Sequence, residues 1–231
     1  LQGVAQLSEA VKRQGVKVLV GFQFRFHPAL QQARRLIKDG AIGEVLSVRA
    51  HWGEYLPNWH PWEDYRRSYA ARPDLGGGVT LTLCHPLDYV RWLLGEVQCL
   101  WAFTGRDGGL SLAVEDRVEI GLRFVGGAIG SIHLDYLQRP AAQWLEVIGS
   151  QGTLRWDYHQ DTLTIIREMG IESQGSFLES RNDMFMAEME HFLAVLCGEA
   201  QPACTLEDGV RALELALAAH ESEQQGRVIC W

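Results

Sequence analysis

The chain has 231 residues, of which 47% are hydrophobic and 22% charged, as is ordinary for a folded protein. These values exclude global disorder, a collagen repeat and a coiled coil, and no apolar run approaches the roughly 18 residues of a membrane helix. The net charge of −8 argues against a non-specific nucleic-acid binder. The five cysteines have no CxxC spacing, so we expect neither a zinc site nor a redox pair, and a reducing, cytoplasmic setting.

The first forty residues predict a helix, a strand and a second helix. Apolar residues follow helical spacing over 2–14, and Gly15 ends that helix. The run VKVLVGFQF predicts a buried strand over 17–24, and Pro28 fits the first turn of a helix over 28–38. A helix and a strand with nothing before them are typical of the end of an α/β sheet. The start at Leu1 leaves open a fragment of a longer gene product or a processed form.

Strand patterns dominate from residue 44 onward. The expected strands are Val45–Trp52, Val97–Thr104, Asp116–Phe124, Ala128–Leu137, Trp144–Ile148, Thr153–Asp157 and Thr162–Arg167. Short turns between the later strands predict an antiparallel meander. The strand at 97–104 is apolar on both faces, so either a second subunit covers the open face or the sheet is wrapped within the chain.

Two helices are expected at the end of the chain. The helix at 181–197 carries methionines and aromatic residues at helical spacing, which we interpret as core packing rather than a cofactor site. Thr205 and Asp208 form a near capping box at the start of the last helix, and Gly226 ends it.

The segment 53–78 is aromatic, charged and without steady periodicity, and long irregular segments of this kind often carry function. Its final Gly76–Gly78 run lacks the spacing of a phosphate loop, so we interpret it as a sharp turn that approaches a ligand closely. Aromatic side chains with polar tips suit a sugar site, although core packing explains some of them: Trp59, Trp62, Tyr65 and Tyr69.

His85 and Asp88 lie three residues apart in a segment of helical spacing at 79–95. A helix places both on one face, and Pro86 either kinks that helix or begins a new one, which frees backbone near Thr82. Histidine exchanges a proton near neutral pH, and an aspartate can orient it. The pair is therefore either a proton-transfer site or a packed histidine beside a capping aspartate.

Gln23 and Arg25 stand at the end of the expected first strand. The carboxyl ends of parallel strands face the ligand crevice of open α/β sheets, so both can reach a polar substrate. A surface salt bridge of Arg25 is an equally good interpretation. The other histidines form no HxxxH or HExxH pair, and no GxSxG motif supports a nucleophilic serine, so no metal ligand is assigned.

Several segments together resemble the glucose–fructose oxidoreductase/inositol dehydrogenase (Gfo/Idh/MocA) family, in the right order over nearly the whole chain. They are GFQFRFHP at 21–28, KDGAIGEV at 38–45, HPWEDYRRSYAARPDLGGGVTLTLCHPLDYVRWLLG at 60–95, IGSQGTLRWD at 148–157 and VRALELALAAHESEQQG at 210–226.

The resemblance implies a Rossmann domain followed by a domain with a large, mostly antiparallel sheet. The fold class expected here is α+β, with helices on one face of that sheet: 29–231 is the substrate-binding and oligomerisation domain, and 1–28 is a remnant of the Rossmann domain. The family's GxGxxG turn and Glu-Lys-Pro motif are absent. No cofactor-binding residue is therefore assigned, and this chain alone is expected to bind NAD or NADP poorly or not at all.

The resemblance also implies roles for single residues. His85 matches a histidine that acts beside the carbon exchanging hydride, and Asp88 matches a second family aspartate. Thr82 stands where many relatives carry an aspartate, although threonine supplies no charge. These three are the catalytic candidates. The substrate-binding candidates are Gln23, Arg25, Tyr65, Tyr69, Asp135 and Arg139.

Two hypotheses follow. The leading one is the C-terminal domain of an NAD(P)-dependent oxidoreductase that acts on a secondary alcohol or ketone of a sugar, nucleotide sugar or cyclitol, and that forms a homo-oligomer through the open sheet face. The alternative is a catalytically silent binding or assembly module without a nucleotide-binding half.

Overall fold

A nine-stranded sheet forms the centre of the protein in this computed structural model, which describes residues 1–177, 180 and 182–231. The strand order is β8-β7-β6-β5-β1-β4-β3-β2-β9, and β1 pairs parallel with β4 while the other pairs are antiparallel. The strands are β1 Val45–Gly53, β2 Val97–Gly105, β3 Arg117–Phe124, β4 Ile129–Asp135, β5 Ala142–Gly149, β6 Gly152–Asp157, β7 Thr162–Arg167, β8 Gly170–Ser176 and β9 Ile229–Cys230.

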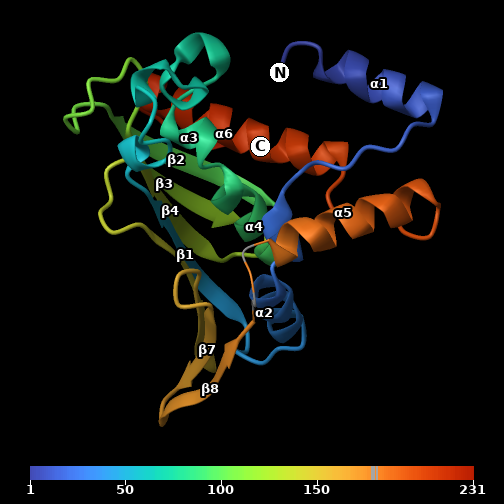
Figure 1. Cartoon of the computed structure of the whole chain (residues 1–231). Helices are drawn as coiled ribbons and strands as arrows, with labels where there is room; N and C mark the ends of the chain where they lie inside the picture. The colour runs from blue at the N-terminus through green and yellow to red at the C-terminus, as the bar shows by residue number, and fades with distance from the viewer. Residues whose placement is uncertain (178–179, 181) are drawn as a thin grey trace.

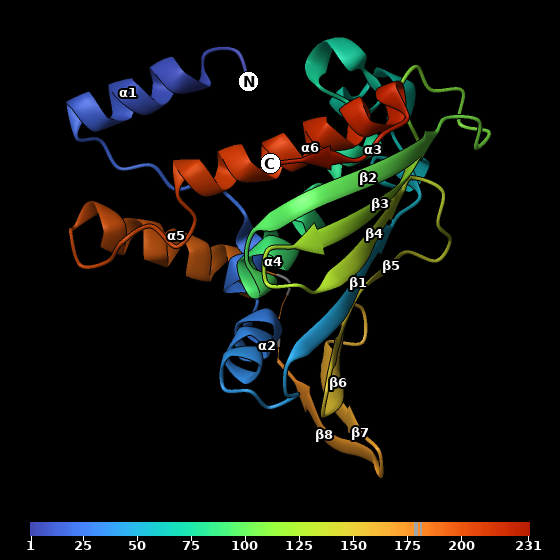
Figure 2. The same ribbon diagram turned by 180° about the vertical axis from the view of Figure 1, so that it is seen from behind.

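The helices cover one face of this sheet, and the hairpin of β7 and β8 extends away from them (Figure 1). The helices are α1 Val4–Gln14, α2 Pro28–Lys38, α3 Val79–Thr82, α4 His85–Leu94, α5 Asp183–Leu196 and α6 Leu206–Gln225. The view from behind shows α6 running along β2 on the same side as α4, whereas α1 lies away from the sheet (Figure 2). The predicted α+β sheet with helices on one face is therefore confirmed at this level.

The sequence explains where several helices begin and end. Pro28 occupies the first turn of α2, and the Nδ1 atom of His27 accepts a hydrogen bond from the Ala29 backbone at 3.2 Å. Thr205 and Asp208 form the expected capping box of α6, which ends at Gly226 in the left-handed conformation.

The core lies between the helices and every second residue of the central strands. Val48, Ala50 and Trp52 of β1 are buried there, as are Ile132 and Leu134 of β4. The side chains of Val48, Ile132 and Leu134 each contribute roughly 1.5–3 kcal/mol when they are removed from water. The intervening residues of the same strands face the other side of the sheet, which no helix of the described part of the chain covers in either view (Figures 1 and 2).

One predicted element is wrong, and two strands were not predicted. The run at 17–24 is not a strand: it is irregular up to a short 3-10 helix, η1, at Gln23–Phe26. The Val20 N–H donates to the Cys204 carbonyl at 3.0 Å and the Phe22 N–H donates to the Val20 carbonyl at 2.8 Å, and among the described residues no neighbouring strand pairs with this run. Strands β8 and β9 were not predicted. The Rossmann remnant at 1–28, and with it the domain division, stays a prediction.

The expectation for the helix at 181–197 is only partly met. Residue 181 lies outside the described residues, and α5 begins at Asp183. Met184 is buried as expected, but four other residues of the predicted apolar stripe are exposed rather than packed in the core: Phe185, Met189, Leu193 and Leu196. The interpretation of the stripe as core packing is therefore correct for Met184 and wrong for these four residues.

The cysteine prediction is also corrected. Cys99 of β2 and Cys230 of β9 are directly opposite in the antiparallel register and form a disulfide. Their separation of 131 residues, rather than a CxxC spacing, is why the pattern did not predict a pair. Among the described residues, no helix is both long enough and apolar enough to cross a membrane.

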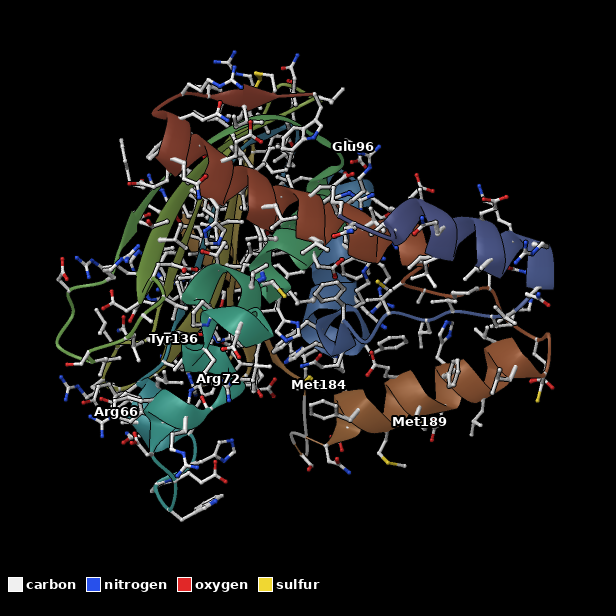
Figure 3. The ribbon with its side chains drawn as sticks, turned by 90° about the horizontal axis from the view of Figure 1, so that it is seen from above. Arg66, Arg72, Glu96, Tyr136, Met184 and Met189 are labelled. Carbon is white, nitrogen blue, oxygen red and sulfur yellow. A yellow bond between two sulfur atoms is a disulfide. The ribbon has the colours of Figure 1, made fainter. Side chains whose placement is uncertain are left out.

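The predicted irregular segment lies between β1 and α3 and contains four short 3-10 turns, η2 Leu56–Asn58, η3 Tyr65–Arg67, η4 Tyr69–Ala71 and η5 Pro73–Leu75. From above, it folds over one end of the sheet beside Tyr136 (Figure 3). The Tyr136 hydroxyl donates to the Ala70 carbonyl at 3.3 Å. This contact fixes the segment as one wall of the site described next.

Candidate functional site

His85 occupies the first residue of α4, immediately after a break in the helical segment. The α3 helix ends at Thr82, Leu83 and Cys84 are not helical, and Pro86 lies in the first turn of α4. Of the two alternatives that Pro86 left open, the structure shows the start of a new helix rather than a kink. The break places the imidazole at a helix end, where it reaches the surface of a cleft.

Aromatic side chains surround the His85 imidazole. The indole of Trp52 stacks on it at 5.4 Å between ring centroids, Phe24 lies at 5.1 Å, and Phe22 meets it edge-on at 5.7 Å. Burial among these rings lowers the pKa of His85 to about 4. The imidazole is therefore neutral at physiological pH, and its Nδ1 atom is buried without a hydrogen-bond partner. A neutral imidazole of this kind can accept a proton.

The cleft beside His85 has a volume of about 680 Å³, which is within the range of small-molecule sites. Its walls come from η1, the end of β1, the irregular segment, α3, the start of α4, β5, the turn between β6 and β7, and α5. The lining residues are Gln23, Phe24, Trp52, Glu54, Trp59, His60, Tyr69, Thr82, Leu83, His85, Ala141, Gln143, Tyr158, His159 and Met184.

Four of the predicted site residues share this cleft: His85, Thr82, Gln23 and Tyr69. Thr82 is the last residue of α3 and lies three residues before His85, on the other side of the break between the two helices. Tyr65 instead lines a smaller neighbouring pocket of about 200 Å³ that shares Tyr69 with the cleft. Its hydroxyl donates to the Leu110 carbonyl at 3.0 Å.

Arg25 and Asp88 do not line the cleft but form a buried ion pair with each other. Arg25 is 4% exposed and Asp88 1%. Arg25 Nε donates to Asp88 Oδ2 at 2.9 Å, and Nη2 donates to Oδ1 at 2.6 Å. The remaining Nη1 donates to the Ala203 carbonyl at 2.7 Å and lies 3.3 Å from Asp208. The pair thus connects η1 to α4. Both side chains form their hydrogen bonds with other groups of the protein rather than with the cleft.

Asp135 and Arg139 also lie outside the cleft lining. Asp135 Oδ1 accepts hydrogen bonds from the backbone of Leu137 at 2.7 Å and Gln138 at 2.6 Å, and Oδ2 lies 3.0 Å from His133 Nε2. Its carboxylate therefore organises the turn after β4. The Arg139 guanidinium stacks over the ring of Tyr55 at 4.1 Å. The substrate-binding roles predicted for both stay predictions.

Glu54 and Gln143 are polar residues of the cleft that were not among the site residues predicted from the sequence. Trp52 and Gln143 are opposite one another in the antiparallel register of β1 and β5, with side chains on the helix-covered face. The Glu54 Oε1 atom accepts from Trp52 Nε1 at 2.8 Å and from Gln143 Nε2. The sequence offers only a weak indication of Gln143. It is the polar residue among the alternate, inward-facing positions of β5, where Leu145 and Val147 are apolar and buried.

The sequence matches the family model for the GFO/IDH/MocA C-terminal domain over residues 30–155, more than half of the chain. The chain belongs to the Gfo/Idh/MocA family. The resemblance noted from the sequence is thereby confirmed. Among curated relatives, the family member myo-inositol 2-dehydrogenase of Thermotoga maritima is 29% identical over 247 residues, which cover 99% of this chain and 69% of the relative. The 1,5-anhydro-D-fructose reductase of Ensifer adhaerens is 26% identical, covering 98% and 68%.

Solved structures show the same fold. An NAD-binding oxidoreductase from Klebsiella pneumoniae has a TM-score of 0.88 at 20% identity, covering 99% of this chain and 70% of that protein. Levoglucosan dehydrogenase in complex with NADH and levoglucosan has a TM-score of 0.87 at 19% identity, covering 98% and 69%. Several such structures contain NAD+ or NADH, so nicotinamide cofactors are used within the Gfo/Idh/MocA family.

The glycine run of this chain does not fit the pyrophosphate of such a cofactor. A Cβ at Gly77 would meet the carbonyl oxygens of Tyr69 and Ala70, and one at Gly78 would meet the Glu115 carboxylate. The Arg72 N–H, which also lies beside Gly77, already donates to the Tyr69 carbonyl, and the other neighbours are hydrogen-bond acceptors, which repel a phosphate rather than bind it. The sequence predicted that this glycine turn approaches a ligand closely. In the structure, the atoms that lie close to the turn are the protein's own backbone and the Glu115 carboxylate. The turn itself requires glycine, because Gly76 and Gly78 have φ angles of 76° and 113°.

Proposed function

We propose that this chain is the substrate-binding and oligomerisation domain of an NAD(P)-dependent oxidoreductase that acts on a secondary alcohol or ketone of a neutral sugar or cyclitol. The cofactor supplies hydride acceptor or donor chemistry when bound, through a domain with its own pyrophosphate site. His85 of this chain takes the alcohol proton when the substrate is oxidised and returns it when a ketone is reduced. The curated relatives, which act on inositol and anhydrofructose by name, support this class of reaction.

One observation carries the proposal. A neutral imidazole with a pKa of about 4 faces a cleft of about 680 Å³ whose walls combine aromatic rings with a few polar side chains. Sugars and cyclitols present alternating apolar ring faces and hydroxyl groups, so flat aromatic walls and a few polar side chains match them. A purely structural histidine would not require a cleft of this size at its side.

The charge of the cleft favours a neutral substrate over a nucleotide sugar or a sugar phosphate. No lysine or arginine lines the cleft in the part of the chain that the structure describes, and Glu54 contributes a carboxylate. Phosphate groups are normally bound by Arg, Lys or backbone N–H groups. We therefore narrow the sequence-derived range of sugar, nucleotide sugar or cyclitol to its uncharged members.

The test compares two measurements. In the first, the complete gene product is assayed for NAD+- and NADP+-dependent oxidation of a panel of neutral sugars and cyclitols. In the second, the 231-residue chain is titrated with NADH and with myo-inositol, using tryptophan fluorescence. We expect turnover in the complete product, binding of the polyol to the chain, and weak or no binding of NADH. Polyol binding without any turnover would favour the silent module.

We further propose that the open face of the sheet associates with a second copy of the chain. Trp101 lies over Gly121 and beside Phe103, and the exposed fractions of Trp101, Phe103 and Ile129 are 42%, 67% and 57%. Exposed apolar side chains gathered on one sheet face are typical of an interface. Next to them, the His51 ring stacks between His133 and Trp144, with centroid distances of 4.9 and 5.4 Å.

A substitution on this face should change the oligomeric state. We expect Phe103→Asp to convert the oligomer to a monomer in light scattering coupled to size exclusion, because a buried unpaired carboxylate in an apolar interface is unfavourable. The matched control is Met169→Asp, at a position that is 98% exposed in the turn between β7 and β8. A monomeric wild-type chain, or an unchanged Phe103→Asp oligomer, would argue for another arrangement.

A further inference from the structure

Two neighbouring side chains in the wall of the cleft, Glu54 and Gln143, carry hydrogen-bond acceptors, and one of these acceptors has no partner inside the protein. Gln143 is 3% exposed, and its Oε1 atom is buried without a hydrogen-bond partner. The amide orientation is set by Glu54, because only the Nε2 side of Gln143 can donate to a carboxylate. Glu54 uses its Oε1 atom for both Gln143 and Trp52. Its Oε2 atom takes part in neither of these bonds and is the second acceptor at this point of the cleft wall.

Burying the Gln143 amide with its Oε1 atom unpaired is unfavourable for folding in the absence of a ligand. Gln143 occupies a helix-facing position of β5 where its neighbours in the row are Leu145 and Val147. A buried amide with one unsatisfied atom costs free energy that an apolar residue would avoid. Buried polar atoms are nearly always paired, so an unpaired one on a residue that lines a cleft points to a partner supplied from the cleft.

We propose that Glu54 and Gln143 together form the specificity site of the cleft, which accepts hydrogen bonds from two neighbouring hydroxyl groups of a neutral cyclic polyol. This inference rests on the proposed function, since it names how the same cleft selects its substrate. The two acceptors require donors on the ligand. Hydroxyl groups supply them, whereas a carboxylate or phosphate would bring only further acceptors and negative charge.

The position of the pair also orients the substrate relative to His85. The indole of Trp52 donates to Glu54 through Nε1 at 2.8 Å, and the same indole stacks on the His85 ring. The specificity site and the imidazole are thus separated by one indole ring. A ligand held by two hydroxyl groups at Glu54 and Gln143 presents another carbon of the same ring to His85, as orientation for proton transfer requires.

The experiment measures binding to the 231-residue chain by calorimetry, with myo-inositol as the neutral polyol, D-glucose as a second neutral ring and D-glucuronate as its anionic counterpart. In the Glu54→Gln variant, the amide oxygen keeps the bonds from Trp52 and Gln143, and an NH2 group replaces Oε2. We expect affinity for myo-inositol and D-glucose to fall roughly ten- to hundredfold. Affinity for D-glucuronate should rise, because a donor now replaces a repelling charge.

Two further variants separate selection from folding. Glu54→Asp keeps the charge but shortens the side chain, so it should weaken polyol binding without improving D-glucuronate binding. The matched control is Glu44→Gln, an exposed glutamate in the turn before β1, which should bind all three ligands as the wild type does. Circular dichroism and thermal melting check that each variant is folded.

The proposal is overturned if Glu54→Gln leaves the ratio of myo-inositol to D-glucuronate affinity unchanged, or if the folded wild-type chain binds no neutral polyol. Failure of the proposed function has a different signature. In that case the chain still binds myo-inositol in a Glu54-dependent way, but the complete gene product transfers no hydride to or from any member of the panel.

Discussion

Replacing His85 by asparagine should lower NAD(P)-dependent turnover of the complete protein by roughly 10²- to 10⁴-fold, the usual contribution of a general acid–base group. Asparagine cannot take up the proton of the substrate hydroxyl, although it fills much of the same space beside Trp52 and Phe24. The value of kcat should therefore fall, whereas KM should change little, because the cleft walls remain. Steady-state kinetics on a polyol that the wild type oxidises would measure both.

The pH dependence gives a second readout for the same residue. Burial lowers the pKa of His85 to about 4, so the imidazole stays neutral and able to accept a proton as the pH falls from 8 to 5. The acid limb of the kcat/KM profile assigned to His85 should therefore lie near pH 4 rather than near 6.5. The control is His191→Asn, on α5 and outside the cleft lining. Wild-type turnover by His85→Asn would remove the imidazole from the mechanism.

The sequence predicted the elements whose signals are local. Pro28 fixed the start of α2, and Thr205, Asp208 and Gly226 fixed both ends of α6, because caps act within a few residues. The run at 17–24 has the apolar character of a strand, but a strand also needs a partner. β9 is only two residues long, and its pairing with β2 depends on chain 131 residues away, so no local pattern could predict it.

The same distinction applies to the site. His85 was selected because its spacing to Asp88 and the adjacent Pro86 are local signals, and the structure places it at a cleft. Local spacing also predicted Asp88 as the partner of His85. In the structure, Asp88 instead pairs with Arg25, which is 63 residues away in the sequence. Glu54 and Gln143 were missed because the register of β1 and β5 brings them together across 89 residues. A pair of residues that is brought together by the register of two strands can be predicted only when the fold is known.

Asp88 should prove necessary for stability and for the placement of His85 rather than for proton transfer. In Asp88→Ala, the Arg25 guanidinium keeps its burial but loses two charge-assisted hydrogen bonds, at 2.9 and 2.6 Å. Breaking a buried ion pair in this way costs about 3–5 kcal/mol. We expect the free energy of unfolding of the 231-residue chain to fall by that amount in urea denaturation followed by tryptophan fluorescence.

Two comparisons decide whether the buried charge is responsible. The exposed Arg72–Asp74 pair of the irregular segment is the matched control, and Asp74→Ala should change the free energy of unfolding very little, since solvent screens that pair. The double variant Arg25→Met with Asp88→Leu removes both charges together, so it should recover much of the stability lost in Asp88→Ala. If Asp88→Ala is as mild as Asp74→Ala, the pair does not tie η1 to α4. The placement of Gln23 and Phe24 beside His85 must then come from aromatic packing alone.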